Sequence, residues 1–131
     1  MLALADAALG KAREALTDFA LHVVLSEIWA VVAEANRYFA ANEPWRLSKT
    51  DPARRDTVLY VTAEVIRQVA ILVQPVMPDA MGKLLDLLGV GPQARSFGAL
   101  GEGGRLASGT TLPAPSGIFP RYVEPEGGEA A

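Results

Sequence analysis

The sequence contains no cysteine and only one histidine, His22. The lack of cysteine excludes disulfides, thiolate metal sites and thiol nucleophiles, and it suits a reducing compartment, so we expect a cytoplasmic protein. A single histidine excludes a multi-histidine metal centre within this chain. We therefore predict no metal site.

The chain also lacks a long apolar run and an excess of positive charge. Its most apolar stretch, residues 69–73, is far shorter than the ~20 residues that a membrane-spanning helix needs, and no basic segment typical of a secretory signal opens the chain. The formal net charge is -3, so the chain as a whole is not a general binder of polyanions. We expect neither a membrane nor DNA as a partner.

Glycine is scarce in the first two thirds of the chain. Residues 1–88 contain two of the 12 glycines, whereas residues 89–131 contain ten of them and five of the nine prolines. This composition predicts a helical bundle over residues 1–89 and an irregular Gly/Pro-rich tail over residues 90–131. Apolar residues in the tail are too sparse for a separate core, so we expect it to lie over the bundle or over a neighbouring domain. We expect its last residues, 125–131, to be disordered.

Apolar residues recur at spacings of three and four through the first part of the chain, which predicts amphipathic helices. The helices are expected over residues 2–16, 18–41, 44–48, 52–73 and 78–88. Asp18 and Asp51 are the expected N-caps of the second and fourth segments, and Gly89 is the expected C-terminal stop of the last. Trp29 is expected in the core. Short connections between long helices favour antiparallel neighbours, so the predicted fold class is all-α, an antiparallel helical bundle.

The connection between the second helix and the next long one carries the most informative residue, Trp45, which directly follows a proline. The surrounding segment has a charge of +3 because Glu43 and Asp51 oppose five cations, which are Arg37, Arg46, Lys49, Arg54 and Arg55. An aromatic ring among cations is typical of proteins that bind single-stranded nucleic acid, where the ring stacks on a base and the cations hold phosphate. The alternatives are a tryptophan packed against the bundle end and solvated cations without a partner.

No pattern in the sequence indicates a catalytic centre, and we predict no catalytic residue. The run from Arg46 to Lys49 has a superficial likeness to the lysine signature of class I aminoacyl-tRNA synthetases. That signature works beside a nucleotide-binding parallel sheet, and no sheet is expected here. The glycines at 101, 103 and 104 neither follow a strand nor open a helix, so a phosphate-binding loop is also unsupported.

Several short motifs occur in a recognisable order and spacing. They are Trp29, Asn36-Arg37-Tyr38, Glu43-Pro44-Trp45, Leu47-Ser48-Lys49, Val73-Gln74-Pro75-Val76-Met77-Pro78 and Ile118-Phe119-Pro120-Arg121. Over about residues 10–123 the chain resembles the anticodon-binding domain of bacterial methionyl-tRNA synthetases. The resemblance implies binding of methionine-specific tRNA through its CAU anticodon, with Trp45 stacked on an anticodon base. The five cations are possible phosphate contacts, inferred from charge alone.

The resemblance also implies that ATP and methionine bind a catalytic domain that this chain lacks. We therefore expect a C-terminal fragment, or a gene model started late, that is inactive alone and binds no cofactor itself. Two alternatives stay open. The chain is a free-standing tRNA-binding or assembly module that acts in trans, or it is the equivalent domain of a class I synthetase for leucine, isoleucine, valine or cysteine. The Pro-Trp element and the Phe-Pro-Arg motif of the tail favour methionine.

Overall fold

The computed structural model describes residues 1–124, and residues 125–131, for which the sequence predicts disorder, lie outside the described residues. The described part is helical and contains no strand, which confirms the all-α class. The elements are α1 (Leu2–Thr17), α2 (Leu21–Asn42), α3 (Pro44–Thr50), α4 (Pro52–Val73), α5 (Pro78–Leu87) and three short 3-10 turns, η1 (Pro92–Ala94), η2 (Phe97–Ala99) and η3 (Glu102–Gly104).

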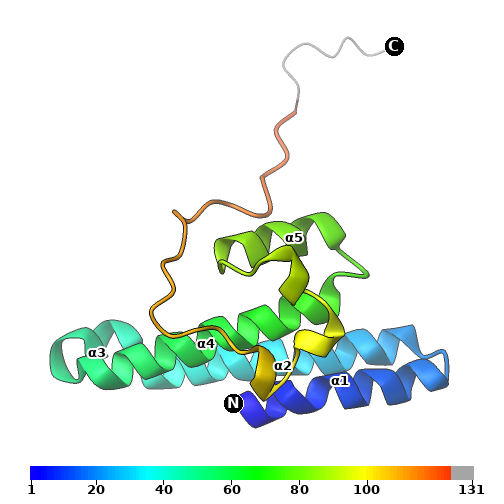
Figure 1. Ribbon diagram of the computed structural model, residues 1–131, viewed down its shortest axis with the longest axis horizontal. Helices are drawn as coiled ribbons and strands as arrows, with labels where there is room; N and C mark the ends of the chain where they lie inside the picture. Colours follow the sequence, from blue (N-terminus) through cyan, green and yellow to red (C-terminus); the bar gives the residue numbers. More distant parts are fainter. Residues whose placement is uncertain (125–131) are drawn as a thin grey trace.

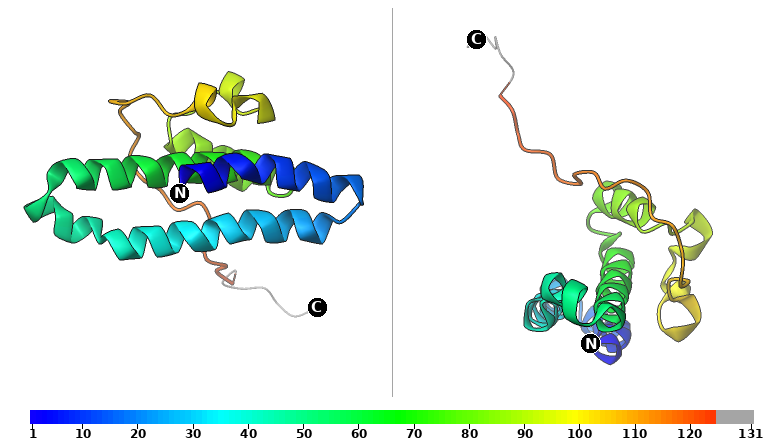
Figure 2. Two further views of the ribbon diagram at one scale, coloured as in Figure 1. Left: turned by 90° about the horizontal axis from the view of Figure 1, so that it is seen from below. Right: turned by 90° about the vertical axis from the view of Figure 1, so that its left-hand side faces the viewer.

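The helices form an antiparallel bundle in which α4 is the central element. Helix α2 runs antiparallel to both α1 and α4, α3 connects α2 to α4 at one end, and α5 turns back over α4 (Figures 1 and 2). Helix α4 contacts each of the other four α-helices. Within residues 1–124, every helix falls short of the combination of length and apolar character that a bilayer crossing requires.

Small residues on α1 and branched residues on α2 and α4 build the core. Ala5, Ala8 and Ala12 lie one turn apart on α1 and are buried, which allows α1 to approach its neighbours closely. Ile28 and Val31 fill the inward face of α2. In the last part of α4, residues 70–73 are all buried. The last turn of α4 is therefore enclosed on all sides.

Two predicted helix boundaries are confirmed by their hydrogen bonds. Asp51 caps α4, because its Oδ1 accepts a hydrogen bond from the backbone N–H of Arg54 at 3.0 Å. Gly89 follows α5 with a φ of +69°. The N–H of Val90 bonds to the carbonyl of Leu85 at 3.0 Å and that of Gly89 to Asp86 at 3.0 Å, which is the Schellman pattern that favours glycine at this position.

Two sequence expectations are wrong. Asp18 does not cap the second helix, because α2 begins at Leu21 with Ala20 as its N-cap, and Asp18 is instead the C-cap of α1. Trp29 does not lie in the core, because 50% of it is exposed. One residue advances a helix by about 100°, so Trp29 follows the buried Ile28 but lies to the side of the inward face.

A buried polar cluster on α4 fastens part of the tail to the bundle. Glu64, Arg67 and Gln68 are at most 1% exposed. Arg67 donates to both carboxylate oxygens of Glu64, at 2.9 and 2.7 Å, and Gln68 donates to Oε1 at 3.1 Å. Arg67 also donates to the carbonyl of Ala99 at 2.9 Å, and the N–H of Leu106 donates to Glu64 at 3.0 Å. Residues 99–106 therefore lie against the bundle.

The charge of this cluster is stabilised by its hydrogen bonds. Burial raises the pKa of Glu64, but the hydrogen bonds from Arg67, from the N–H of Leu106 and from Gln68 outweigh burial and hold that pKa below its ordinary value. Glu64 is thus ionised, as its ion pair with Arg67 requires. The sequence analysis did not single out this cluster, because nothing in the pattern of α4 distinguishes a buried charge from an exposed one.

Candidate nucleic-acid interface

Trp45 is the second residue of α3, and its indole faces solvent. The residue is 57% exposed, while the preceding Pro44 is buried and anchors the start of the helix. The ring of Phe39 on α2 supports it, with the two ring centroids 6.0 Å apart and the planes at 54°. This arrangement leaves a flat aromatic surface open at one end of the bundle, which is the geometry that stacking on a base requires.

The short helix that carries Trp45 is joined to its neighbours by single residues. Glu43 connects α2 to α3 in the left-handed conformation, with φ 41° and ψ 60°, and Asp51 connects α3 to α4. The carbonyl of Glu43 accepts hydrogen bonds from the N–H groups of Arg46 and Leu47, at 2.8 and 3.3 Å. Because the joints are so short, α3 forms the tip of the bundle (Figure 1).

The five cations near Trp45 divide into two groups. Three of them form exposed ion pairs, which are Arg37–Glu34 at 2.6 Å, Arg46–Glu43 at 2.9 Å and Arg55–Asp56 at 2.6 Å. Lys49 and Arg54 form no ion pair within residues 1–124. The guanidinium of Arg54 instead donates to the side-chain oxygen of Asn42 at 2.8 Å.

The local excess of positive charge is therefore smaller than the sequence suggested. Glu34 and Asp56 lie just beyond the residues counted there, and both neutralise a cation in the folded chain. The hydrogen bond and the charge of Glu43 raise the pKa of Arg46 above its ordinary value. Lys49 is the one cation of the five with no hydrogen bond or ion pair to another described residue.

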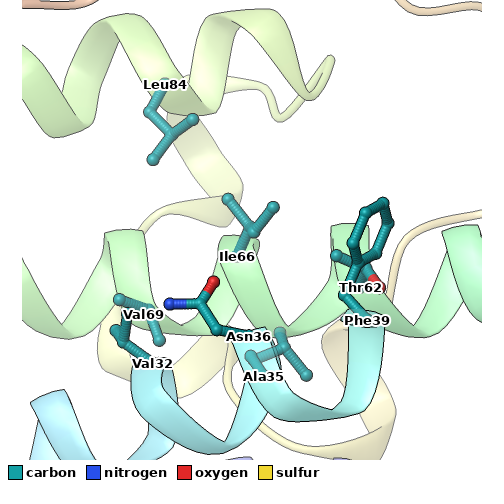
Figure 3. A pocket seen from close by; sticks show the side chains of 9 residues that line it. Val32, Ala35, Asn36, Phe39, Thr62, Ile66, Val69 and Leu84 are labelled. Atoms are coloured by element: carbon teal, nitrogen blue, oxygen red, sulfur yellow. The ribbon is translucent and has the colours of Figure 1, made fainter. Parts of the chain in front are cut away.

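An apolar groove of about 330 Å³ lies beside this tip, between α2, α4 and α5. Phe39 lines one part of it and also contacts Trp45, so the groove adjoins the exposed indole. Figure 3 shows the amide of Asn36 among the apolar side chains. The lining residues are Val32, Ala35, Asn36, Phe39, Thr62, Val65, Ile66, Val69 and Leu84. The sequence analysis did not predict this groove, since it arises only where three helices meet.

The single histidine and the acidic side chains of residues 1–124 do not assemble into a metal site. His22 is exposed on α2. Residues 1–124 contain no group of three or more histidine, aspartate or glutamate side chains placed to hold a metal ion.

Solved structures identify the class of protein. A crystal structure of the apo form of Mycobacterium tuberculosis methionyl-tRNA synthetase matches with a TM-score of 0.87 and 49% identity, over 95% of this chain and 25% of that chain. A complex of the same enzyme with methionyl-adenylate matches equally well, over 92% of this chain and 24% of that one. The bundle is thus a helical domain of the kind found in aminoacyl-tRNA synthetases.

Sequence comparisons identify the family. The model for the anticodon binding domain of methionyl tRNA ligase matches residues 4–129. A methionine–tRNA ligase of Rhizobium meliloti (strain 1021) is 60% identical over 126 residues, covering 96% of this chain and 24% of the relative. One from Mycobacterium tuberculosis (strain ATCC 25618 / H37Rv) is 48% identical over 130 residues, covering 96% of this chain and 25% of the relative. The chain therefore belongs to the family of methionyl-tRNA ligase anticodon-binding domains.

The resemblance drawn from the short motifs is thus confirmed. The chain spans about a quarter of the length of the curated relatives it matches. The alternatives, a free-standing module or the domain of a synthetase for another amino acid, receive no support from these matches.

Proposed function

We propose that this chain recognises the CAU anticodon of methionine-specific tRNA, and that it does so as part of a ligase that joins methionine to tRNA using ATP. The observation that carries the proposal is the exposed indole of Trp45 at the tip of the bundle, at the residue where the family resemblance implies base stacking. ATP and methionine bind elsewhere in such a ligase, and a tRNA substrate fits the expected cytoplasmic location.

The cations near Trp45 contribute unequally to phosphate binding in this proposal. Lys49 is exposed and lacks a carboxylate partner within residues 1–124, so it is the leading phosphate contact. Arg37, Arg46 and Arg55 each exchange an acidic side chain for a phosphate when RNA binds. Exposed ion pairs are weak, so this exchange is accessible.

The test is the substitution Trp45→Ala in the protein as its gene encodes it. Loss of one base stack costs about 1 to 3 kcal/mol, so the Kd for methionine-specific tRNA should rise about five- to 150-fold. Binding is measured by fluorescence anisotropy of a labelled anticodon stem-loop and by aminoacylation of the whole tRNA.

Trp29→Ala is the matched control, because Trp29 is also half-exposed but lies on α2 away from the joint. It should leave the Kd unchanged. A stem-loop whose CAU is replaced by another triplet should bind the wild-type protein more weakly than the CAU stem-loop does. The Trp45→Ala protein should bind the two stem-loops with similar affinity. Equal affinity of wild type and Trp45→Ala for tRNA would remove Trp45 from the site.

A further inference from the structure

Arg54 has a different environment from the other cations near Trp45. Its Nη2 donates a hydrogen bond to Oδ1 of Asn42 at 2.8 Å. The amide of Asn42 in turn donates through Nδ2 to the carbonyl of Tyr38, also at 2.8 Å. That carbonyl lies one turn before the C-terminal end of α2. Arg54 is therefore tied to the C-terminal end of α2.

This contact, which we call the Asn42–Arg54 brace, closes the loop that carries Trp45. Asn42 is the last residue of α2, and Arg54 lies in the first turn of α4. Between α2 and α4 are only α3 and its two single-residue joints. The backbone N–H of Arg54 also bonds to Asp51, the second of these joints, at 3.0 Å. Arg54 thus holds both ends of the segment that presents the indole.

A ring that is held in one orientation binds a base better than one that samples several. Association has to offset the loss of freedom of every group that becomes ordered, so a restraint already present in the free protein raises affinity. The buried Pro44 anchors the start of α3, and the indole contacts Phe39. The brace adds a charge-assisted hydrogen bond that links α2 directly to α4.

We propose that Arg54 is a positioning residue for the stacking surface of Trp45, and that it acts through Asn42 rather than by contacting phosphate. The expected effect of Arg54 on RNA binding rests on the proposed function, whereas the effect of Arg54 on the orientation of the indole does not. The sequence analysis grouped Arg54 with the phosphate contacts because its charge was the only property visible there.

Arg54→Met and Lys49→Met are the matched variants, since each removes one positive charge within the same segment. Both are made with Trp29→Phe, so that Trp45 is the only tryptophan left in this 131-residue sequence. Without RNA, Arg54→Met should change the near-ultraviolet circular dichroism of Trp45 and its quenching by acrylamide, and Lys49→Met should change neither. Asn42→Ala should reproduce Arg54→Met, and combining the two should add nothing, because both remove the same contact.

The salt dependence of binding to a CAU stem-loop distinguishes a positioning residue from a residue that contacts phosphate. Arg54→Met should raise the Kd about two- to tenfold, as expected for one hydrogen bond, with an unchanged slope of log K against log salt concentration. Lys49→Met should lower that slope by about 0.7, as for one lost phosphate contact on single-stranded RNA. Asn42→Asp keeps an acceptor for Arg54 and should keep the Trp45 signature.

An unchanged Trp45 signature in Arg54→Met or in Asn42→Ala would overturn the proposal. So would a salt slope reduced by about 0.7 in Arg54→Met, because Arg54 would then contact phosphate. A thermal melting curve of each variant shows whether the variant is folded at the temperature at which its spectra are recorded. If Trp45→Ala leaves tRNA binding unchanged while Arg54→Met changes the Trp45 signature, the proposed function fails and the positioning of the indole stands.

Discussion

Two Glu–Arg pairs of equal spacing lie in different regions of this molecule, at α3 and in the middle of α4, and water reaches only the first. Glu43–Arg46 and Glu64–Arg67 are each three residues apart, with N–O distances of 2.9 and 2.7 Å. The side chain of Arg46 is 72% exposed, and that of Arg67 is 1% exposed. The same local motif thus occurs in two environments.

The comparison teaches that burial, not spacing, decides what such a pair does. At α4 the remaining hydrogen-bonding groups of the pair bind the backbone at Ala99 and Leu106, so the pair is a structural fastening for the tail. At α3 the pair is surrounded by water, which weakens the attraction between its charges. Arg46 can therefore exchange its partner when an anion approaches Trp45.

The largest expected effect comes from breaking the buried pair. Arg67→Met keeps most of the side-chain volume but leaves the charge of Glu64 buried without a counter-charge. Removing one partner of a buried pair costs about 3 to 5 kcal/mol, and the free energy of unfolding should fall by that amount in urea denaturation. A decrease of less than about 1 kcal/mol, the range of an exposed pair, would show that burial does not make the Glu64–Arg67 pair more important for stability than an exposed pair.

A smaller effect is expected from the hydrogen bond that holds the tail beside this pair. The hydroxyl of Tyr60 donates to the carbonyl of Leu106 at 2.8 Å. Tyr60→Phe should lower the free energy of unfolding by about 0.5 to 1.5 kcal/mol. Tyr38→Phe is the control, because no hydrogen bond of its hydroxyl occurs within residues 1–124, and it should have no such effect. Equal losses in both variants would contradict this role for Tyr60.

The pH dependence of stability provides a further test of the buried pair. The pKa of Glu64 is lower in the folded protein than its ordinary value, and in an unfolded chain a glutamate has a pKa of about 4.3. Its stabilising contribution is therefore complete well above pH 4.3 and is lost as the pH falls through the folded pKa. The effect is modest because burial and the hydrogen bonds shift the pKa in opposite directions.

This contribution is measured as the free energy of unfolding in urea between pH 7 and pH 3. Glu64→Gln cannot ionise, so its stability should fall less steeply with decreasing pH than that of wild type. Parallel curves for the two proteins would show that Glu64 does not contribute to the acid sensitivity of the fold.

The smallest effect is expected for the exposed pair. Arg46→Met should leave the midpoint of urea unfolding unchanged, because water already solvates both charges of the Glu43–Arg46 pair. The same variant should weaken binding of the CAU stem-loop slightly and reduce its salt dependence. Destabilisation comparable to that of Arg67→Met would remove the distinction between the two regions.

Much of the fold was predictable because helix boundaries depend on nearby residues. Asp51 followed by Pro52 predicted the start of α4, and the hydrogen bond from the N–H of Arg54 to Oδ1 of Asp51 confirms it. The assignment of Asp18 as a cap was wrong because the chain continues through Phe19 in a left-handed conformation before α2 begins. Sequence alone identified Trp45 as the candidate for stacking, and that role stays a prediction.

The order of the helices and most of their boundaries, the family resemblance and the choice of Trp45 were determined by the sequence by itself, because each rests on local spacing or on short motifs in the chain. Only the tertiary structure decided which polar side chains are buried. Arg67 is hydrogen-bonded to Ala99, and Glu64 to Leu106, across more than 30 residues of the chain. Trp29 faces solvent because of how α2 packs. Burial depends on contacts between distant segments, and no local pattern of residues encodes them.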